Sequence, residues 1–229
     1  MPQIFDNIEK DLLTTLKQAI GLSERCDFCV GYFNLRGWRQ VDSLIENWAG
    51  GDGHCCRLLV GMQQMPHDQL RSAMSLTRSG WQIDQATAAA LKRRLAQDFR
   101  DQLMVGIPTN ADEEGLRRLA AQISSRKLVV KLFLRYPLHA KLYLLFRQDL
   151  LNPKIGYLGS SNLTLAGLSK QGELNVDVLD HDACNKLDKW FEDRWNDKFC
   201  INISQELVDI INNSWERPEP IPPFHIYVK

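Results

Sequence analysis

The chain has 229 residues, of which 44% are hydrophobic and 24% charged, which is the composition of an ordinary globular protein with room for a substantial core. Its 28 Lys and Arg residues balance 28 Asp and Glu residues, which excludes a global electrostatic signature of nucleic-acid binding. No apolar run approaches the roughly 20 residues of a membrane span, and no secretion signal opens the chain. We therefore expect a cytoplasmic protein with reduced thiols and no membrane partner.

The first half of the chain predicts helices interleaved with strands. Apolar residues at helical spacing, such as Leu12, Leu16 and Ile20, indicate the first helix. Tyr32 and Phe33, at the end of the first strand, have two interpretations, of which core packing is favoured over lining the catalytic site described below. The predicted helices cover residues 6–20, 37–51, 67–104 with a break near 79–80, and about 111–123, and the predicted strands cover 25–33 and 55–62.

The second half begins with four strand-like runs. Strands mixed with helices in this order predict an α/β protein, a three-layer α/β/α sandwich with a mixed, largely central β-sheet. We expect one domain over residues 1–215, and four prolines between 218 and 223 indicate that 216–229 is a linker towards a further domain. The predicted strands cover 127–134, 139–146, 154–160 and 174–180, and the predicted helices cover 182–198 and about 203–213.

The six cysteines raise the question of a metal site. Cys26 and Cys29 form a C-x-x-C, which is the spacing of half a zinc site. They lie in a strand-like run, where small buried thiols are common, and no second C-x-x-C or H-x3-H pair completes a site. We therefore predict no structural zinc, and because the sequence lacks a glycine-rich phosphate loop we expect no cofactor.

The stretch HAKLYLLF, residues 139–146, places an imidazole and an ammonium at the start of an otherwise apolar strand. Because strand side chains alternate between faces, His139, Lys141 and Tyr143 are predicted to share one face. A neutral imidazole can attack phosphorus and form a covalent phosphoryl-enzyme, and an ammonium beside it stabilises the negative charge that develops. A lone histidine in a strand is more often structural, so this interpretation depends on its companions.

Polar residues follow the next strand. In GSSNLT, residues 159–164, three hydroxyls and the amide of Asn162 suit the oxygens of a phosphate, and the alternative for Asn162 is that it caps a turn. Glu173 precedes the last predicted strand, where its carboxylate can hold one nitrogen of the His139 ring. The predicted catalytic residues are His139, Lys141, Asn162 and Glu173, and the predicted substrate-binding residues are Ser160, Ser161 and Thr164.

A basic block precedes and includes this region. Two interpretations stay open, a solvated face and a phosphate-binding surface beside His139. Between 117 and 141 the chain carries no acidic residue, and its basic residues are Arg117, Arg118, Arg126, Lys127, Lys131, Arg135 and Lys141.

The pattern H-x-K at 139–141, G-S-S-N at 159–162 and a glutamate at 173 resembles the signature of the phospholipase D superfamily, most closely that of its nuclease-like members. The upstream DFCVGYFNLRGW is similar to the first strand and helix of phospholipase-D-like domains that precede bacterial helicase modules. The resemblance implies a metal-independent phosphodiesterase that acts on DNA, in a nuclease or restriction-type protein with a fused helicase.

The resemblance also implies a homodimer. In the superfamily two such motifs meet at one site, where one histidine is the nucleophile and the other protonates the leaving oxygen. Only one H-x-K occurs in this chain, so two copies would share a site on their two-fold axis.

One position departs from the superfamily pattern. The full pattern is H-x-K-x4-D, and Phe146 stands where the aspartate is expected. This departure makes a phospholipase less favoured and leaves an alternative function, a catalytically silent module for nucleic-acid binding or dimerisation. A lipid phosphodiesterase ranks last, because the sequence shows no amphipathic helix with a basic face.

Overall fold

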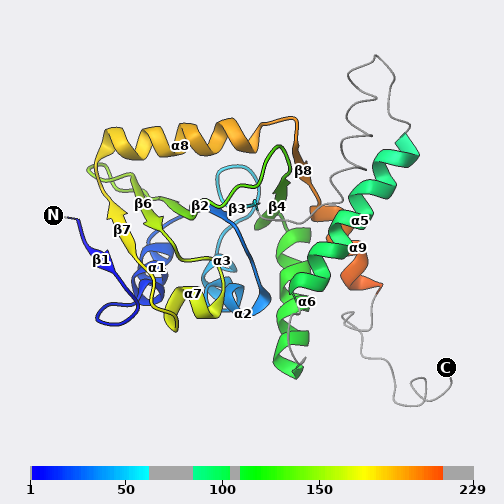
Figure 1. Cartoon of the computed structure of the whole chain (residues 1–229), viewed down its shortest axis with the longest axis horizontal. Helices are drawn as coiled ribbons and strands as arrows, with labels where there is room; N and C mark the ends of the chain where they lie inside the picture. Colours follow the sequence, from blue (N-terminus) through cyan, green and yellow to red (C-terminus); the bar gives the residue numbers. More distant parts are fainter. Residues whose placement is uncertain (1, 62–84, 104–108, 214–229) are drawn as a thin grey trace.

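A mixed eight-stranded sheet forms the centre of the computed structural model, which describes residues 2–61, 85–103 and 109–213 (Figure 1). The spatial order is β1-β7-β6-β5-β2-β3-β4-β8. The three strands β2, β3 and β4 are parallel, and every other neighbouring pair is antiparallel. The strands are β1 (Ile4–Phe5), β2 (Arg25–Val30), β3 (Cys56–Val60), β4 (Leu128–Phe133), β5 (Leu142–Phe146), β6 (Lys154–Gly159), β7 (Asn175–Val178) and β8 (Cys200–Asn202).

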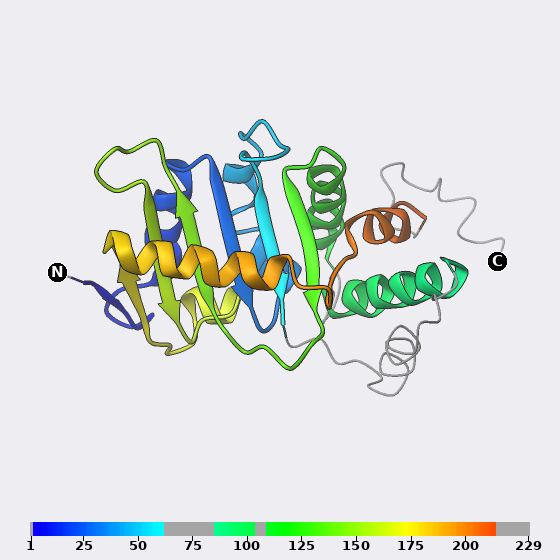
Figure 2. The ribbon, with the colours of Figure 1, turned by 90° about the horizontal axis from the view of Figure 1, so that it is seen from above.

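Helices cover both faces of the sheet, which confirms the predicted three-layer α/β fold (Figure 1). Among the described helices, α8 is the one that covers one face, and Figure 2 shows this helix crossing the strands. The opposite face carries α1, α2, α3, α6 and α7, while α9 packs against α6 and α5 packs against α9. The helices are α1 (Leu12–Gly21), α2 (Leu35–Trp38), α3 (Asp42–Ile45), α5 (Gln85–Leu103), α6 (Asn110–Ser124), α7 (Leu165–Ser169), α8 (His181–Trp195) and α9 (Ser204–Asn212).

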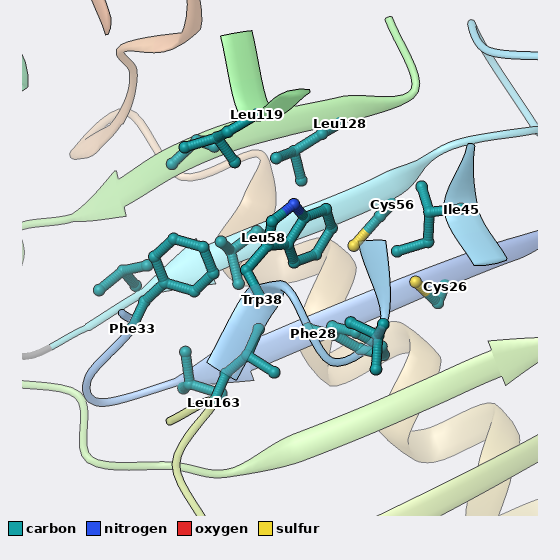
Figure 3. Close-up of a cluster of buried hydrophobic side chains, with 14 of the residues drawn as sticks. Cys26, Phe28, Phe33, Trp38, Ile45, Cys56, Leu58, Leu119, Leu128 and Leu163 are labelled. Atoms are coloured by element: carbon teal, nitrogen blue, oxygen red, sulfur yellow. The ribbon is translucent and has the colours of Figure 1, made fainter. Parts of the chain in front are cut away.

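The sheet separates two buried hydrophobic clusters. The larger lies on the α1 side and contains Phe33, Trp38 and Leu163 (Figure 3). The smaller lies under α8 and contains Phe191 and Trp195. Strand β5 contributes side chains to both clusters. Tyr143 and Leu145 belong to the larger cluster, and Leu142 and Leu144 belong to the smaller. A central strand that is buried on both faces reads as a continuous apolar run, as this one does.

The ends of the helices follow local hydrogen bonding. The first helix begins at Leu12 rather than near residue 6, because the Asp6 carboxylate accepts the N–H groups of Ile8, Glu9 and Lys10 and so forms a turn. The Asp11 carboxylate then caps the helix at the N–H of Thr14. The helix predicted over 111–123 is confirmed as α6, which a capping box at Thr109 begins.

Other boundaries differ from the predictions. The helix expected over 37–51 is two short helices, because tight bonds from the Gln40 N–H to the Gly37 oxygen and from the Val41 N–H to the Trp38 oxygen separate them. Strand β5 starts at Leu142 rather than at residue 139. The first part of the helix expected over 67–104 and the linker expected over 216–229 lie outside the described residues.

Candidate active site

Four strand ends meet at one edge of the sheet. Strand β5 is antiparallel to β2 and β6, and β6 is antiparallel to β7. The carboxyl ends of β2 and β6 therefore lie beside the amino ends of β5 and β7. Tyr32, His139, Ser160 and Glu173 stand just outside these ends. The sheet topology thus brings together residues from distant parts of the sequence.

His139 is exposed, and its ring lies against the ammonium of Lys141. Lys141 Nζ is 2.8 Å from each ring nitrogen and 3.0 Å from the His139 carbonyl oxygen. Both residues precede β5, whereas Tyr143 is buried within it. The lysine side chain instead folds back on the histidine. Because an ammonium only donates, the ring nitrogen that accepts from it is unprotonated.

Lys141 is only 5% exposed. Its burial lowers the pKa of the ammonium from the ordinary 10.5, and the carboxylate of Glu173 opposes this decrease. A positive charge with little water around it interacts strongly with an anion that binds next to it. The ammonium is therefore well placed to hold a phosphate oxygen at the His139 ring.

Asn162 is fixed by the loop that follows β2. The N–H of Tyr32 donates to Asn162 Oδ1 at 2.9 Å. Since an N–H can only donate, this contact identifies the oxygen and leaves Nδ2 to donate to a ligand. The next residues of the two loops, Phe33 and Leu163, form a β-bridge and lie in the larger hydrophobic cluster (Figure 3). The side chain of Asn162 thus links two loops rather than capping its own turn.

Glu173 contacts Ser160. The Ser160 hydroxyl donates to the Glu173 carboxylate and accepts the N–H of Leu174 at 3.0 Å. The Ser160 side chain is thus engaged in positioning the glutamate, although it stays exposed at the site. The role of Glu173 in orienting the His139 ring stays a prediction.

Ser161 is a structural residue and not an accessible phosphate ligand. It is fully buried, and its hydroxyl accepts from Asn175 Nδ2 at 2.8 Å. Its N–H donates to Asn175 Oδ1 at 3.2 Å, and its carbonyl accepts from the Tyr143 hydroxyl at 2.9 Å. Sequence reasoning missed Asn175, although an asparagine at the start of an apolar strand is an unusual residue whose amide needs partners.

Thr164 caps a helix. Its hydroxyl accepts the N–H of Gly167 at 3.0 Å and so begins α7, a five-residue helix that the sequence did not predict. The Thr164 hydroxyl, which was predicted to bind substrate, therefore accepts a backbone N–H instead.

Most side chains of the basic block have partners within the protein. Arg118 pairs with Asp42, and Arg135 pairs with Asp197. Lys131 donates to the carbonyl of Trp195 and lies over its ring. The remaining pairs are Arg117 with Glu113 and Lys127 with Glu46. These contacts support the solvated-face interpretation for most of the block and leave Lys141 as the lysine at the site.

The two cysteines of the C-x-x-C do not form half of a zinc site. Cys26 belongs to the larger hydrophobic cluster and Cys29 to the one under α8, so they lie on opposite faces of β2. Burial raises the pKa of the Cys29 thiol to about 12, which keeps it protonated and a poor metal ligand. Residues three positions apart in a strand point to opposite faces of the sheet, as the two cysteines of this C-x-x-C do.

Three carboxylates approach one another at a second place. Asp27, Asp188 and Glu192 are the one group with metal-ligand spacing among the described residues. Arg57 binds Asp27 in a bidentate pair at 2.6 Å and also pairs with Glu192, while Lys154 pairs with Asp188. These cations already balance the carboxylates, so the group is an ion-pair network between the sheet and α8.

The chain matches a known protein family. Residues 12–195 match the family described as cardiolipin synthase, PLD-like domain, which is a phospholipase D-like family. The chain belongs to this family. The match includes every residue predicted to be catalytic or substrate-binding. Among curated proteins, no sequence relative matches this PLD-like chain.

Solved structures share the PLD-like fold. Phosphatidylserine synthase from Haemophilus influenzae Rd KW20 superposes with a TM-score of 0.50 and 16% identity, over 88% of this chain and 39% of that chain. Nuc, a phospholipase D family member from Salmonella typhimurium, has a TM-score of 0.49, 12% identity and coverage of 88% and 97%. NucT from Helicobacter pylori has a TM-score of 0.48, 10% identity and coverage of 88% and 98%.

Proposed function

We propose that this PLD-like chain is a metal-independent phosphodiesterase that cleaves DNA through a phosphohistidine at His139. The observation that carries the proposal is an exposed imidazole whose ring nitrogens lie 2.8 Å from the buried ammonium of Lys141. Asn162 stands at the same edge of the sheet, because Tyr32 contacts its amide through the backbone and the His139 ring through its own ring. We infer that His139 as nucleophile and Lys141 and Asn162 as donors act on one phosphate at this edge.

The chemistry consists of two displacements. A ring nitrogen of His139 attacks phosphorus, and the P–N bond forms as the P–O bond to the leaving strand breaks. Lys141 and Asn162 Nδ2 donate to the non-bridging oxygens, where negative charge accumulates. A second histidine protonates the leaving oxygen. That histidine then takes a proton from water, which attacks phosphorus and breaks the P–N bond.

The second histidine comes from a second copy of the chain. Each chain contains one H-x-K, so a single site with two histidines requires a homodimer with the site on its two-fold axis. In this arrangement His139 is the nucleophile in one subunit and the general acid in the other. A helicase module in the same protein, inferred from the DFCVGYFNLRGW similarity, would supply the DNA strand.

The second candidate is a catalytically silent DNA-binding or dimerisation module. Phe146, in the aspartate position of the superfamily pattern, is the observation that favours it. Phe146 lies at the opposite end of β5 from His139, under the guanidinium of Arg25 at 4.2 Å. The replacement therefore removes no group that touches the His139 imidazole, and the active phosphodiesterase remains the better supported function.

A lipid phosphodiesterase ranks below both. In the part of the chain that the structure describes, no helix combines the length and the apolar character needed to cross a bilayer. Vesicles serve as the comparison substrate in the test.

The test is cleavage of DNA in excess EDTA by the wild type and by His139→Ala. We expect the wild type to cut and the variant to lose at least about three orders of magnitude in rate, because the nucleophile is gone. The matched control is His181→Ala, which removes another exposed histidine, at the start of α8, and should leave the rate unchanged. Cleavage that needs a divalent metal would overturn the mechanism. DNA binding without cleavage would favour the silent module, and cleavage of vesicle lipids alone would favour the lipid enzyme.

A further inference from the structure

Exposed aromatic rings are rare on the described residues. Tyr32 is 47% exposed and Tyr136 is 43% exposed, and every other described Phe, Tyr or Trp is more buried. Tyr32 follows β2, and Tyr136 lies in the loop that leads to His139. The expectation that Tyr32 packs in the core is wrong, whereas its neighbour Phe33 is buried as expected.

The Tyr32 ring faces the proposed nucleophile. Its centroid is 6.2 Å from that of the His139 ring, and the two planes stand at 77°. In this edge-to-face arrangement one ring presents its edge, so aromatic surface remains uncovered. Tyr136 has a different contact, because its ring packs edge-on against Phe133 at 4.9 Å.

The backbone at Tyr32 is fixed independently of the ring. Its N–H binds Asn162, and Phe33 anchors the following residue in the hydrophobic cluster. The ring thus projects from a rigid position without being needed to hold it. A preorganised aromatic side chain loses little conformational entropy when a flat ligand stacks on it.

We propose that Tyr32 is the stacking platform for a nucleobase of single-stranded DNA, whose adjoining phosphate lies at His139. This inference rests on the proposed function and gives it a substrate class. Stacking on an exposed aromatic ring requires an unpaired base, because duplex bases are already stacked on one another.

The test is binding of a short labelled single-stranded oligodeoxynucleotide, with His139→Asn in every protein so that no strand is cut. Tyr32→Ala should weaken binding about tenfold, and Tyr32→Phe should stay within about twofold, because the phenyl ring still stacks. The matched control is Tyr136→Ala, which removes a ring of similar exposure and should change binding by less than about twofold. Equal melting temperatures of the variants show that the fold is retained.

An abasic strand separates stacking from phosphate contact. It keeps the phosphates, so Tyr32→Ala should no longer weaken its binding. The inference fails if Tyr32→Ala weakens abasic and normal strands equally, if a duplex shows the same Tyr32 dependence, if only anionic phospholipid vesicles do, or if single strands do not bind. Because binding is measured without turnover, Tyr32-dependent binding would stand even if cleavage in EDTA were absent.

Discussion

At the scale of single residues, the oxygen and the nitrogen of the Asn162 amide have different roles in the proposed mechanism. Its oxygen accepts the Tyr32 N–H, and its nitrogen is available to a phosphate. Asn162→Asp keeps an acceptor for Tyr32 but places a negative charge where the donor was. We expect kcat to fall about 100- to 1000-fold with little change in thermal stability, as when an oxyanion donor is removed. Steady-state kinetics and a melting curve check this, and a variant that keeps its rate would exclude Asn162 from the phosphate.

The charge of Lys141 predicts a pH dependence. Burial lowers the pKa of its ammonium below 10.5, so the folded protein loses this charge at a lower pH than an ordinary lysine does. Because the proposed mechanism needs the charged form, kcat/KM should decline on the alkaline side at a pH below 10.5. A pH profile of kcat/KM measures this. In Lys141→Arg the decline should move to higher pH, because a guanidinium stays charged, and an identical decline in both proteins would exclude Lys141 as its cause.

The sequence motif predicts residue types at the site better than it predicts what each atom does. His139 contacts Lys141, and Tyr32 contacts both Asn162 and the His139 ring. The hydroxyls of Ser161 and Thr164 instead satisfy buried or helical groups. A hydroxyl suits a phosphate and a backbone N–H equally well, so only the three-dimensional neighbours decide between them.

At the scale of elements, Arg25 and Arg57 on the sheet pair both with Asp27 of β2 and with Glu192 of α8. Asp27 is fully buried, and Arg57 and Arg25 both bind it. Asp27→Ala leaves these guanidinium groups without their partner, and we expect a loss of about 3–5 kcal/mol in the free energy of unfolding. Urea denaturation measures it.

The control is Asp182→Ala, in the first turn of the same helix. Its pair with Lys186 is 75% exposed on both sides, so the change should cost at most about 1 kcal/mol. Equal effects of the two substitutions would show that burial does not decide the strength of these pairs.

Long elements are predictable from the sequence, and short ones are not. Apolar periodicity over many residues located α6 and α8, and continuous apolar runs located β3 and β5. The elements β1, β8 and α7 have two, three and five residues, which is too short for a period to show. Their positions depend on partners distant in sequence, as when β1 pairs with β7.

At the scale of the whole molecule, the proposed site is complete only in a dimer. We expect light scattering to give twice the 26.3 kDa of one chain. Mixing the wild type with an excess of His139→Ala should reduce activity by forming hybrid dimers that hold one functional histidine. A monomer that cleaves DNA at full rate would contradict the shared site.

The most direct test of covalent catalysis is the intact mass of the protein, quenched with alkali during a single turnover of DNA in EDTA. We predict a transient mass increase equal to the retained DNA fragment, located at His139 and absent from His139→Ala. Product that accumulates while the protein stays unmodified throughout the turnover, or a fragment attached to another residue, would contradict the account.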